Sequence, residues 1–191
     1  MHSRLLAILL LGTATVTGQA PAALPARNQA LLLLRVLAYD RNLRSRAGDE
    51  LTVAVAFREG DPASTRERDE LAAALEEAAH GFVVSGLRVR VRRVPWRGTD
   101  DLAARLATDR PAALLVGGAL SGEAAAISAA TRSRAVLSFG PSREMVEAGL
   151  ALGLVNRGIR AGLVVNLAAA REEGADLDAG LLAVAEVVGK Q

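Results

Sequence analysis

The amino-acid sequence predicts an α/β fold, with a compact, mostly parallel sheet flanked by helices and a C-terminal antiparallel hairpin. From residue 27 on, apolar runs of strand length alternate with segments of helical periodicity, a pattern typical of parallel strands joined by helical crossovers. Two later apolar runs are separated only by Asn156-Arg157-Gly158, which suits a tight hairpin turn. Hydrophobic residues make up 51% of the chain but aromatic residues only 3%, so Leu, Val and Ala must form the core.

The first predicted elements are a helix, a strand and a second helix. Leucines recur at helical spacing within residues 27–46, and Gly48 is expected to end that helix. Residues 51–57 form a short apolar run that suits a buried strand. Residues 66–82 carry apolar side chains at i, i+3, i+4 and i+7, which predicts an amphipathic helix.

The alternation continues through the middle of the chain. We expect strands over residues 87–94, 112–116 and 135–139, and helices that begin near Thr99, Ser121 and Ser142. Pro95 is expected to end the first of these strands, because proline cannot donate to a central ladder.

The C-terminal part departs from the alternation. Residues 152–155 and 159–165 form the predicted hairpin, which we expect to close one edge of the sheet. Asn166 can cap a helix through Glu172, and residues 177–188 are predicted to form a last amphipathic helix.

Residues 1–26 are predicted to be a signal peptide, leaving residues 27–191 as one domain. Arg4 precedes an apolar run, and small residues and prolines follow it, in the order typical of export signals. A buried N-terminal helix is the alternative. The run is shorter than the ~20 residues of a membrane span, so we expect a periplasmic product. Cleavage after Ala22 and cleavage after Ala20 both fit the small-residue pattern.

The composition excludes several classes of function. The 23 basic residues nearly balance the 21 acidic ones, which argues against a nucleic-acid partner. Cysteine is absent, so disulfides, cysteine nucleophiles and thiolate metal ligands are excluded. His80 is the single histidine after residue 26 and sits at a predicted helix end, which is a common structural position. We therefore predict no enzyme, no metal and no cofactor; a hydrolase that uses unassigned carboxylates is the remaining catalytic alternative.

Two turns could hold a small or anionic ligand. Each follows a predicted strand and opens a helix, at the sheet edge where open α/β sheets bind ligands and where helix N-termini attract anions. The candidate cleft residues are Gly117, Gly118, Ser121, Gly140, Ser142 and Arg143. The structural alternative is that any turn from strand to helix needs glycine and a capping residue.

A basic strand is the candidate partner surface. Arg88, Arg90 and Arg92 alternate with valines, so the arginines share one face of a strand, and Trp96 follows. Arg and Trp are favoured anchors of protein interfaces. The structural alternative is an edge strand whose charges prevent edge-to-edge pairing.

The C-terminal third resembles the YfiR family. The resemblance rests on residues 149–155, with alternating glycine and apolar residues, on the stretch Asn166-Leu167-Ala168-Ala169-Ala170-Arg171, and on the leucine-containing residues 177–182. The earlier elements follow the family's order more loosely.

The resemblance implies a periplasmic regulator with an α/β sandwich fold that can dimerise. The family's best-known member represses a membrane-bound diguanylate cyclase by binding its periplasmic sensor domain. This chain differs in having no cysteines, so redox control through disulfides does not apply, and in lacking an aromatic-Trp-Pro ending of the first helix at residues 38–43.

The sequence thus leads to two principal hypotheses. The first is a regulator that binds the periplasmic sensor part of a membrane protein, either a diguanylate cyclase or a sensor kinase. The second is an extracytoplasmic protein that binds a small ligand at the two glycine turns.

Overall fold

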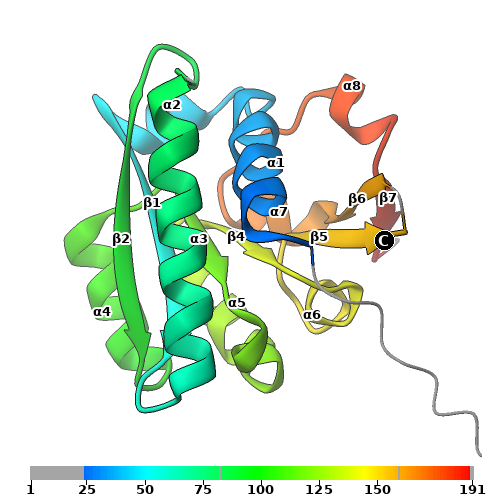
Figure 1. The fold of residues 1–191 in the computed structure, drawn as a ribbon. Helices are drawn as coiled ribbons and strands as arrows, with labels where there is room; N and C mark the ends of the chain where they lie inside the picture. Colours follow the sequence, from blue (N-terminus) through cyan, green and yellow to red (C-terminus); the bar gives the residue numbers. More distant parts are fainter. Residues whose placement is uncertain (1–23, 82, 159, 190–191) are drawn as a thin grey trace, which may run out of the picture.

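A computed structural model describes residues 24–81, 83–158 and 160–189. Most of the predicted signal peptide, residues 1–23, lies outside the described residues. Within the described part of the chain, seven strands form one sheet in the order β2-β1-β3-β4-β5-β6-β7 (Figure 1). The strands are β1 (Glu50–Arg58), β2 (Arg88–Trp96), β3 (Ala113–Val116), β4 (Leu137–Gly140), β5 (Leu152–Arg157), β6 (Arg160–Asn166) and β7 (Glu186–Val188).

The sheet is mostly parallel, as the sequence predicts. Strands β2, β1, β3, β4 and β5 run parallel, β6 is antiparallel to β5, and β7 is parallel to β6. The helices are α1 (Ala26–Ala38), α2 (Leu43–Ala47), α3 (Pro62–Gly81), α4 (Thr99–Asp109), α5 (Ala124–Arg132), α6 (Arg143–Glu147), α7 (Leu167–Glu172) and α8 (Ala179–Leu182), with a 3₁₀ helix η1 (Gly118–Glu123).

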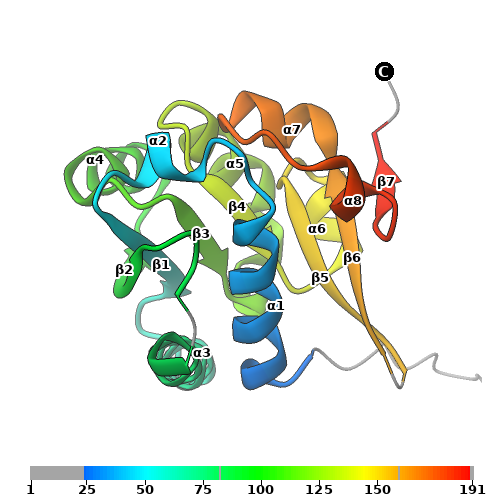
Figure 2. The ribbon, with the colours of Figure 1, turned by 90° about the horizontal axis from the view of Figure 1, so that it is seen from above.

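Helices cover both faces of the sheet (Figure 2). Helices α1 and α3 pack on one face, and α4, α5 and α6 pack on the other. Strand β1 faces both layers, since Val53 and Val55 belong to the first apolar cluster while Ala54 and Ala56 belong to the second. Burial on both faces explains why β1 is a continuous apolar run rather than an alternating one.

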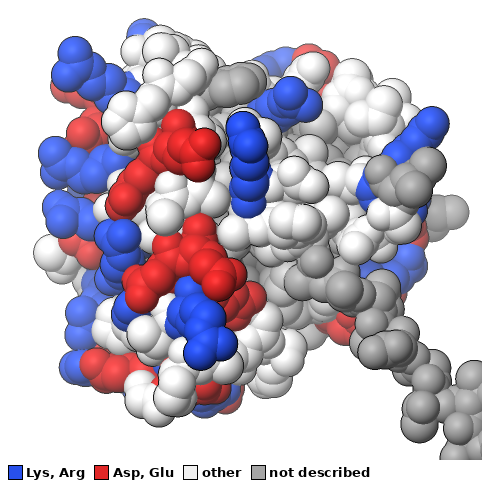
Figure 3. Space-filling view, viewed as in Figure 1, with Lys and Arg blue, Asp and Glu red and all other residues white. Residues whose placement is uncertain are grey.

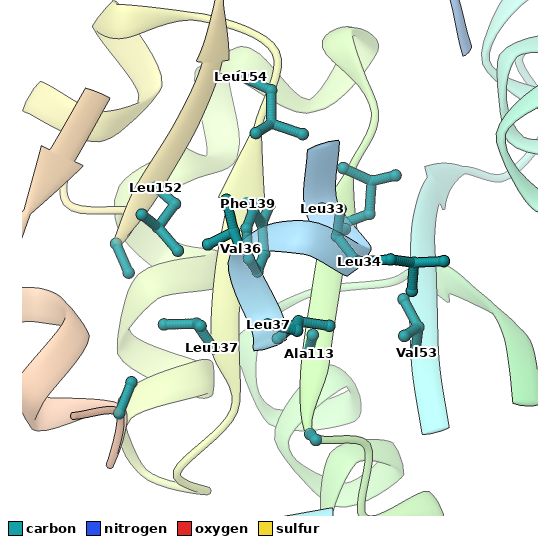
Figure 4. Close-up of a cluster of buried hydrophobic side chains, with 14 of the residues drawn as sticks. Leu33, Leu34, Val36, Leu37, Val53, Ala113, Leu137, Phe139, Leu152 and Leu154 are labelled. Carbon is teal, nitrogen blue, oxygen red and sulfur yellow. The ribbon is translucent and has the colours of Figure 1, made fainter. Parts of the chain in front are cut away.

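Helix α1 lies over the centre of the sheet. Its residues Leu33, Leu34 and Leu37 are fully buried and face β1, β3, β4 and β5, where they meet Phe139 among other side chains (Figure 4). The leucine periodicity of the sequence therefore predicts the correct packing face.

The predicted helix over residues 27–46 is in fact two helices. Helix α1 ends at Ala38, and α2 begins at Leu43. The break follows from Asp40, whose carboxylate accepts the backbone N–H of Asn42 at 3.0 Å, because a local side-chain bond of this kind stabilises a turn in place of a helix. Gly48 ends α2 with φ +68°, as predicted.

The predicted C-terminal helix over residues 177–188 is wrong. Only Ala179–Leu182 is helical, and Glu186–Val188 forms strand β7 beside β6. Pairing with the exposed edge of β6 outweighs the weak helical periodicity of this segment. The edge of the sheet is therefore closed by β7 and not by the predicted hairpin. The hairpin β5–β6 and the Asn166 cap of α7 are confirmed.

A buried ion pair joins distant parts of the chain. The Asp40 and Arg46 side chains are 0% and 8% exposed and form a hydrogen-bonded ion pair. Asp40 also accepts the backbone N–H of Asp176 at 2.9 Å, and Arg46 Nη1 donates to the carbonyls of Ala112 at 2.6 Å and Ala135 at 3.3 Å. The pair thus ties α2 to the starts of β3 and β4 and to the C-terminal segment.

A second buried carboxylate lies between α5, β4 and α7. Glu173 is fully buried and accepts hydrogen bonds from Thr131 Oγ1 at 2.5 Å and from Ser138 N and Oγ, both at 2.7 Å. Burial raises the pKa of the Glu173 carboxyl from 4.5 to about 7, although the bonds from Thr131 and Ser138 act in the opposite direction.

This raised pKa makes the free energy of unfolding fall as pH rises. Between pH 4.5 and about 7, the folded chain keeps a proton on Glu173 that the unfolded chain releases. Each pH unit in this window changes the free energy of unfolding by about 1.4 kcal/mol, so above pH 7 the free energy of unfolding is about 3 kcal/mol lower than below pH 4.5. We predict that Glu173→Gln removes this dependence, measured by urea unfolding across the window. Glu77→Gln, at an exposed position, is the control; an unchanged pH profile in Glu173→Gln would contradict the assignment.

Candidate functional site

The two glycine turns lie at the carboxyl ends of β3 and β4, next to the switch point of the sheet. The chain passes from β1 outward to β2 through α3 and returns to β3 through α4 on the other face. The crevice between β1 and β3 is therefore the position where open α/β sheets bind ligands. Gly117 follows β3 and donates its N–H to Ala56 of β1 at 3.1 Å.

The crevice already holds a carboxylate of the protein itself. Both oxygens of Glu67, on α3, accept the N–H of Gly118, at 2.9 and 3.0 Å. A Cβ at Gly117 would lie 2.9 Å from Glu67 Oε2 and 3.3 Å from the carbonyl oxygen of Ala56, so only glycine allows this approach. Glu67 thus occupies the place that an anionic ligand would take at the start of η1.

Charged side chains bridge the rim of the same crevice. Arg58, at the end of β1, reaches Glu123 Oε1 at 3.1 Å and the carbonyl of Ala119 at 3.4 Å. Ser121 lies exposed within η1. These contacts join the end of β1 to η1 over the Gly117–Gly118 turn.

The second turn is packed against its own helix. A Cβ at Gly140 would lie 2.9 Å from Leu150 Cδ1 and 3.1 Å from Met145 Sδ. Ser142 caps α6 by accepting the N–H of Met145 at 3.4 Å. The turns are neighbours, since Pro141 Cγ is 3.8 Å from the Cβ position of Gly118.

Arg143 points its charge toward the C-terminal strand. Its Nε donates to Glu147 Oε1 at 2.7 Å, and its Nη1 forms an ion pair with Glu186 of β7. Arg157 of β5 pairs with the same carboxylate. Arg143 therefore links α6 to β7 and, among the described residues, pairs with Glu147 and Glu186 rather than with the glycine turns.

The basic strand β2 is the outermost strand of the sheet. Arg88, Arg90 and Arg92 are exposed on one face, and Arg90 pairs with Glu50 of β1 at 2.9 Å. Figure 3 shows basic side chains along this edge, beside acidic side chains over α3. Trp96 is half-buried and packs against the apolar cluster under α4. The strand continues through Pro95 to Trp96, beyond the predicted end, because an edge strand tolerates proline.

Glu67 is the site residue that sequence reasoning missed. Ser64, Leu71 and Leu75 are buried on the sheet-facing side of α3, and Glu67 falls on the same side at helical spacing. The sequence signal that could have identified Glu67 is a carboxylate on the helix side where buried residues recur. The sequence predicts a ligand at the Gly117–Gly118 turn, but the backbone N–H of Gly118 is bonded to Glu67.

The described residues contain no cluster of three or more His, Cys, Asp or Glu side chains that could hold a metal ion. In the same part of the chain, no helix is both long and apolar enough to cross a membrane. His80 donates a hydrogen bond of 2.7 Å from its Nδ1 to the carbonyl of Glu76, one turn earlier on α3.

Three solved structures share the fold. A conserved domain protein from Vibrio cholerae aligns at 15% identity with a TM-score of 0.62, covering 89% of this chain and 62% of that chain. An ABC domain in complex with L-Trp from Streptococcus pneumonia aligns at 18% identity with a TM-score of 0.58, covering 86% and 62%.

The third structure is a ligand-free, open substrate-binding protein with adhesive properties from Clostridium difficile. It aligns at 12% identity with a TM-score of 0.55, covering 78% of this chain and 58% of that chain. This chain therefore spans about three fifths of each of these proteins.

Sequence comparison identifies a family. No curated protein matches the chain, but the model of the DUF4154 family, described as YfiR/HmsC-like, matches residues 63–186. The match begins in α3, ends in β7, and includes the basic strand β2 and both glycine turns. The chain belongs to the YfiR/HmsC-like family.

Proposed function

We propose that this chain is a periplasmic signalling regulator that binds the periplasmic sensor part of a membrane protein, either a diguanylate cyclase or a sensor kinase. Family membership carries the proposal, because the YfiR/HmsC-like family is linked to regulation of cyclic-di-GMP signalling and not to catalysis. In this proposal residues 1–26 are a signal peptide, and residues 27–191 form the regulatory domain, which can associate with a second copy.

The crevice at the switch point supports protein binding over ligand binding. Its backbone donor at Gly118 is occupied by Glu67, and its rim is bridged by Arg58 and Glu123. A free anion entering there would have to displace a carboxylate that the fold holds in place. In this proposal the partner protein binds to the surface of the domain and not to this crevice.

Strand β2 is the partner surface that we propose. Arg88 and Arg92 are exposed and have no acidic partner within the described residues, while Arg90 is paired with Glu50. Exposed unpaired arginines steer and orient an acidic partner surface. Trp96 packs against the apolar cluster on the buried side of the strand, so we expect it to contribute less to partner binding than the exposed arginines.

A small-ligand-binding function is the alternative. The fold is shared with a protein solved with L-Trp and with a substrate-binding protein, and both glycine turns lie where such folds bind ligands. This alternative requires that the Glu67 carboxylate moves or is itself part of the ligand site.

Recovery of the partner from native membranes tests the proposal. The tagged chain would be crosslinked in its native cells and purified, and its companions would be identified by mass spectrometry. Enrichment of a membrane sensor with a cytoplasmic signalling domain is the expected result. Recovery of the chain alone, at good yield and with efficient crosslinking of a known periplasmic complex, would count against it.

We predict that the double substitution Arg88→Glu and Arg92→Glu weakens partner binding about tenfold or more, because it places like charges across the interface. The matched control is Arg35→Glu with Arg171→Glu, two exposed positions elsewhere with the same change of charge. Both variants should melt within about 2 °C of the natural chain. Equal partner binding by the two double variants would exclude β2 as the surface.

Removal of the Glu67 carboxylate should expose an anion site. We predict that Glu67→Ala lowers stability by about 1–3 kcal/mol, since the N–H of Gly118 loses its acceptor. Acetate, compared with chloride at the same ionic strength, should then raise the melting temperature of the variant but not of the natural chain. Glu70→Ala, at an exposed position on the same helix, is the control. Absence of an acetate effect in Glu67→Ala would show that the turn holds no anion.

A further inference from the structure

A hollow lined by arginines lies at the opposite end of the sheet from the glycine turns. It has a volume of about 550 Å³ and lies where β3 and β4 begin, between α2 and the C-terminal ends of α4 and α5. In Figure 2, which looks onto this end of the sheet, α2 lies next to α4 and in front of α5. We call it the arginine hollow; its charged lining residues are Arg46, Arg110, Arg132 and Arg134.

The lining of the arginine hollow has an excess of positive charge. None of the described residues that line it is acidic. Arg46 is neutralised by Asp40 behind it, and Arg132 pairs with Glu172 at 2.9 Å. Arg110 and Arg134 are exposed, and neither has an acidic partner among the described residues. Two guanidinium charges are thus left uncompensated at one concave surface.

The buried Arg46 has an unused donor. Its side chain is 8% exposed, and its two terminal nitrogens are bonded to Asp40, Ala112 and Ala135. Its Nε is buried and has no hydrogen-bond acceptor within the described chain. Buried donors are nearly always paired, so this unsatisfied N–H is an unusual feature of a residue that lines the hollow.

The backbone of the two turns that flank the hollow is also unusual. Arg110 has φ +46° and Ala135 has φ +53°, and these are two of the three non-glycine residues with positive φ in the described part of the chain. Left-handed backbone at such residues is unfavourable and often occurs where geometry serves a site. Here it shapes the turns that carry Arg110 and Arg134.

We propose that the arginine hollow binds a dianionic oxyanion of the phosphate class, either free or as the phosphate group of a small metabolite. Planar guanidinium groups bind phosphate oxygens through paired N–H bonds. The two uncompensated guanidinium charges, of Arg110 and Arg134, match the charge of a dianion. The proposal does not depend on the regulatory function, because the hollow lies at the other end of the strands from the glycine turns and is formed by this chain alone.

Titration calorimetry with inorganic phosphate tests the proposal, at constant ionic strength set by chloride. We expect measurable binding to the natural chain and affinity at least roughly tenfold weaker after Arg110→Ala with Arg134→Ala, because each removes a charge-assisted bond. The matched control is Arg66→Ala with Arg160→Ala, which removes two exposed arginines elsewhere and should leave the affinity within about twofold.

Two outcomes would overturn the proposal. One is the absence of phosphate binding to the natural chain; the other is equal binding by the two double variants when both remain folded by circular dichroism. A parallel titration with glycerol 3-phosphate distinguishes the sources: tighter binding than inorganic phosphate identifies an attached phosphate group, and weaker binding identifies the free ion. Partner recovery from membranes is measured separately, so failure of either proposal leaves the other testable.

Discussion

The buried pair of Asp40 and Arg46 is the interaction on which the arrangement of the sheet most depends. Both side chains are removed from water, and removal of either one would leave the other as an uncompensated buried charge, which is strongly unfavourable. The pair fixes α2 beneath the starts of β3 and β4 and holds the segment at Asp176 against the α1–α2 turn. Segments that are far apart in the sequence are therefore ordered together.

At the other end of the strands, side-chain carboxylates again join segments that are far apart in the sequence. Glu67 satisfies the N–H of Gly118, and Arg58 with Glu123 bridges the rim above it. The fold is shared with a domain solved in complex with L-Trp and with a substrate-binding protein, and in this chain an intramolecular acid lies at the switch point of the sheet. Such an arrangement keeps the architecture while it occupies the backbone donor of Gly118 with a side chain of the protein itself.

The sequence predicts elements whose apolar pattern is local, and it misses features that need a distant partner. Helix α3, strand β1 and the hairpin β5–β6 follow from periodicity and turn residues alone. The helix break at Asp40 depends on contacts with Arg46 and Asp176, and strand β7 depends on pairing with the edge of β6. Neither feature can be predicted from the local sequence pattern. The structure places Gly117 and Gly140 at the ends of β3 and β4, but the occupation of the Gly117–Gly118 turn by Glu67 arises only from tertiary structure.

The short strand β7 has a consequence for how the chain behaves in concentrated solution. Its three residues pair with the edge of β6. Glu186 of β7 forms ion pairs with Arg143 of α6 and Arg157 of β5, which hold β7 in place. Without it, the backbone of the valine-rich strand β6 would be open to pairing with another molecule, and an uncovered apolar edge is a template for aggregation. The last residues of the fold thus protect its solubility, and a variant that loses them would be prone to assemble through β6.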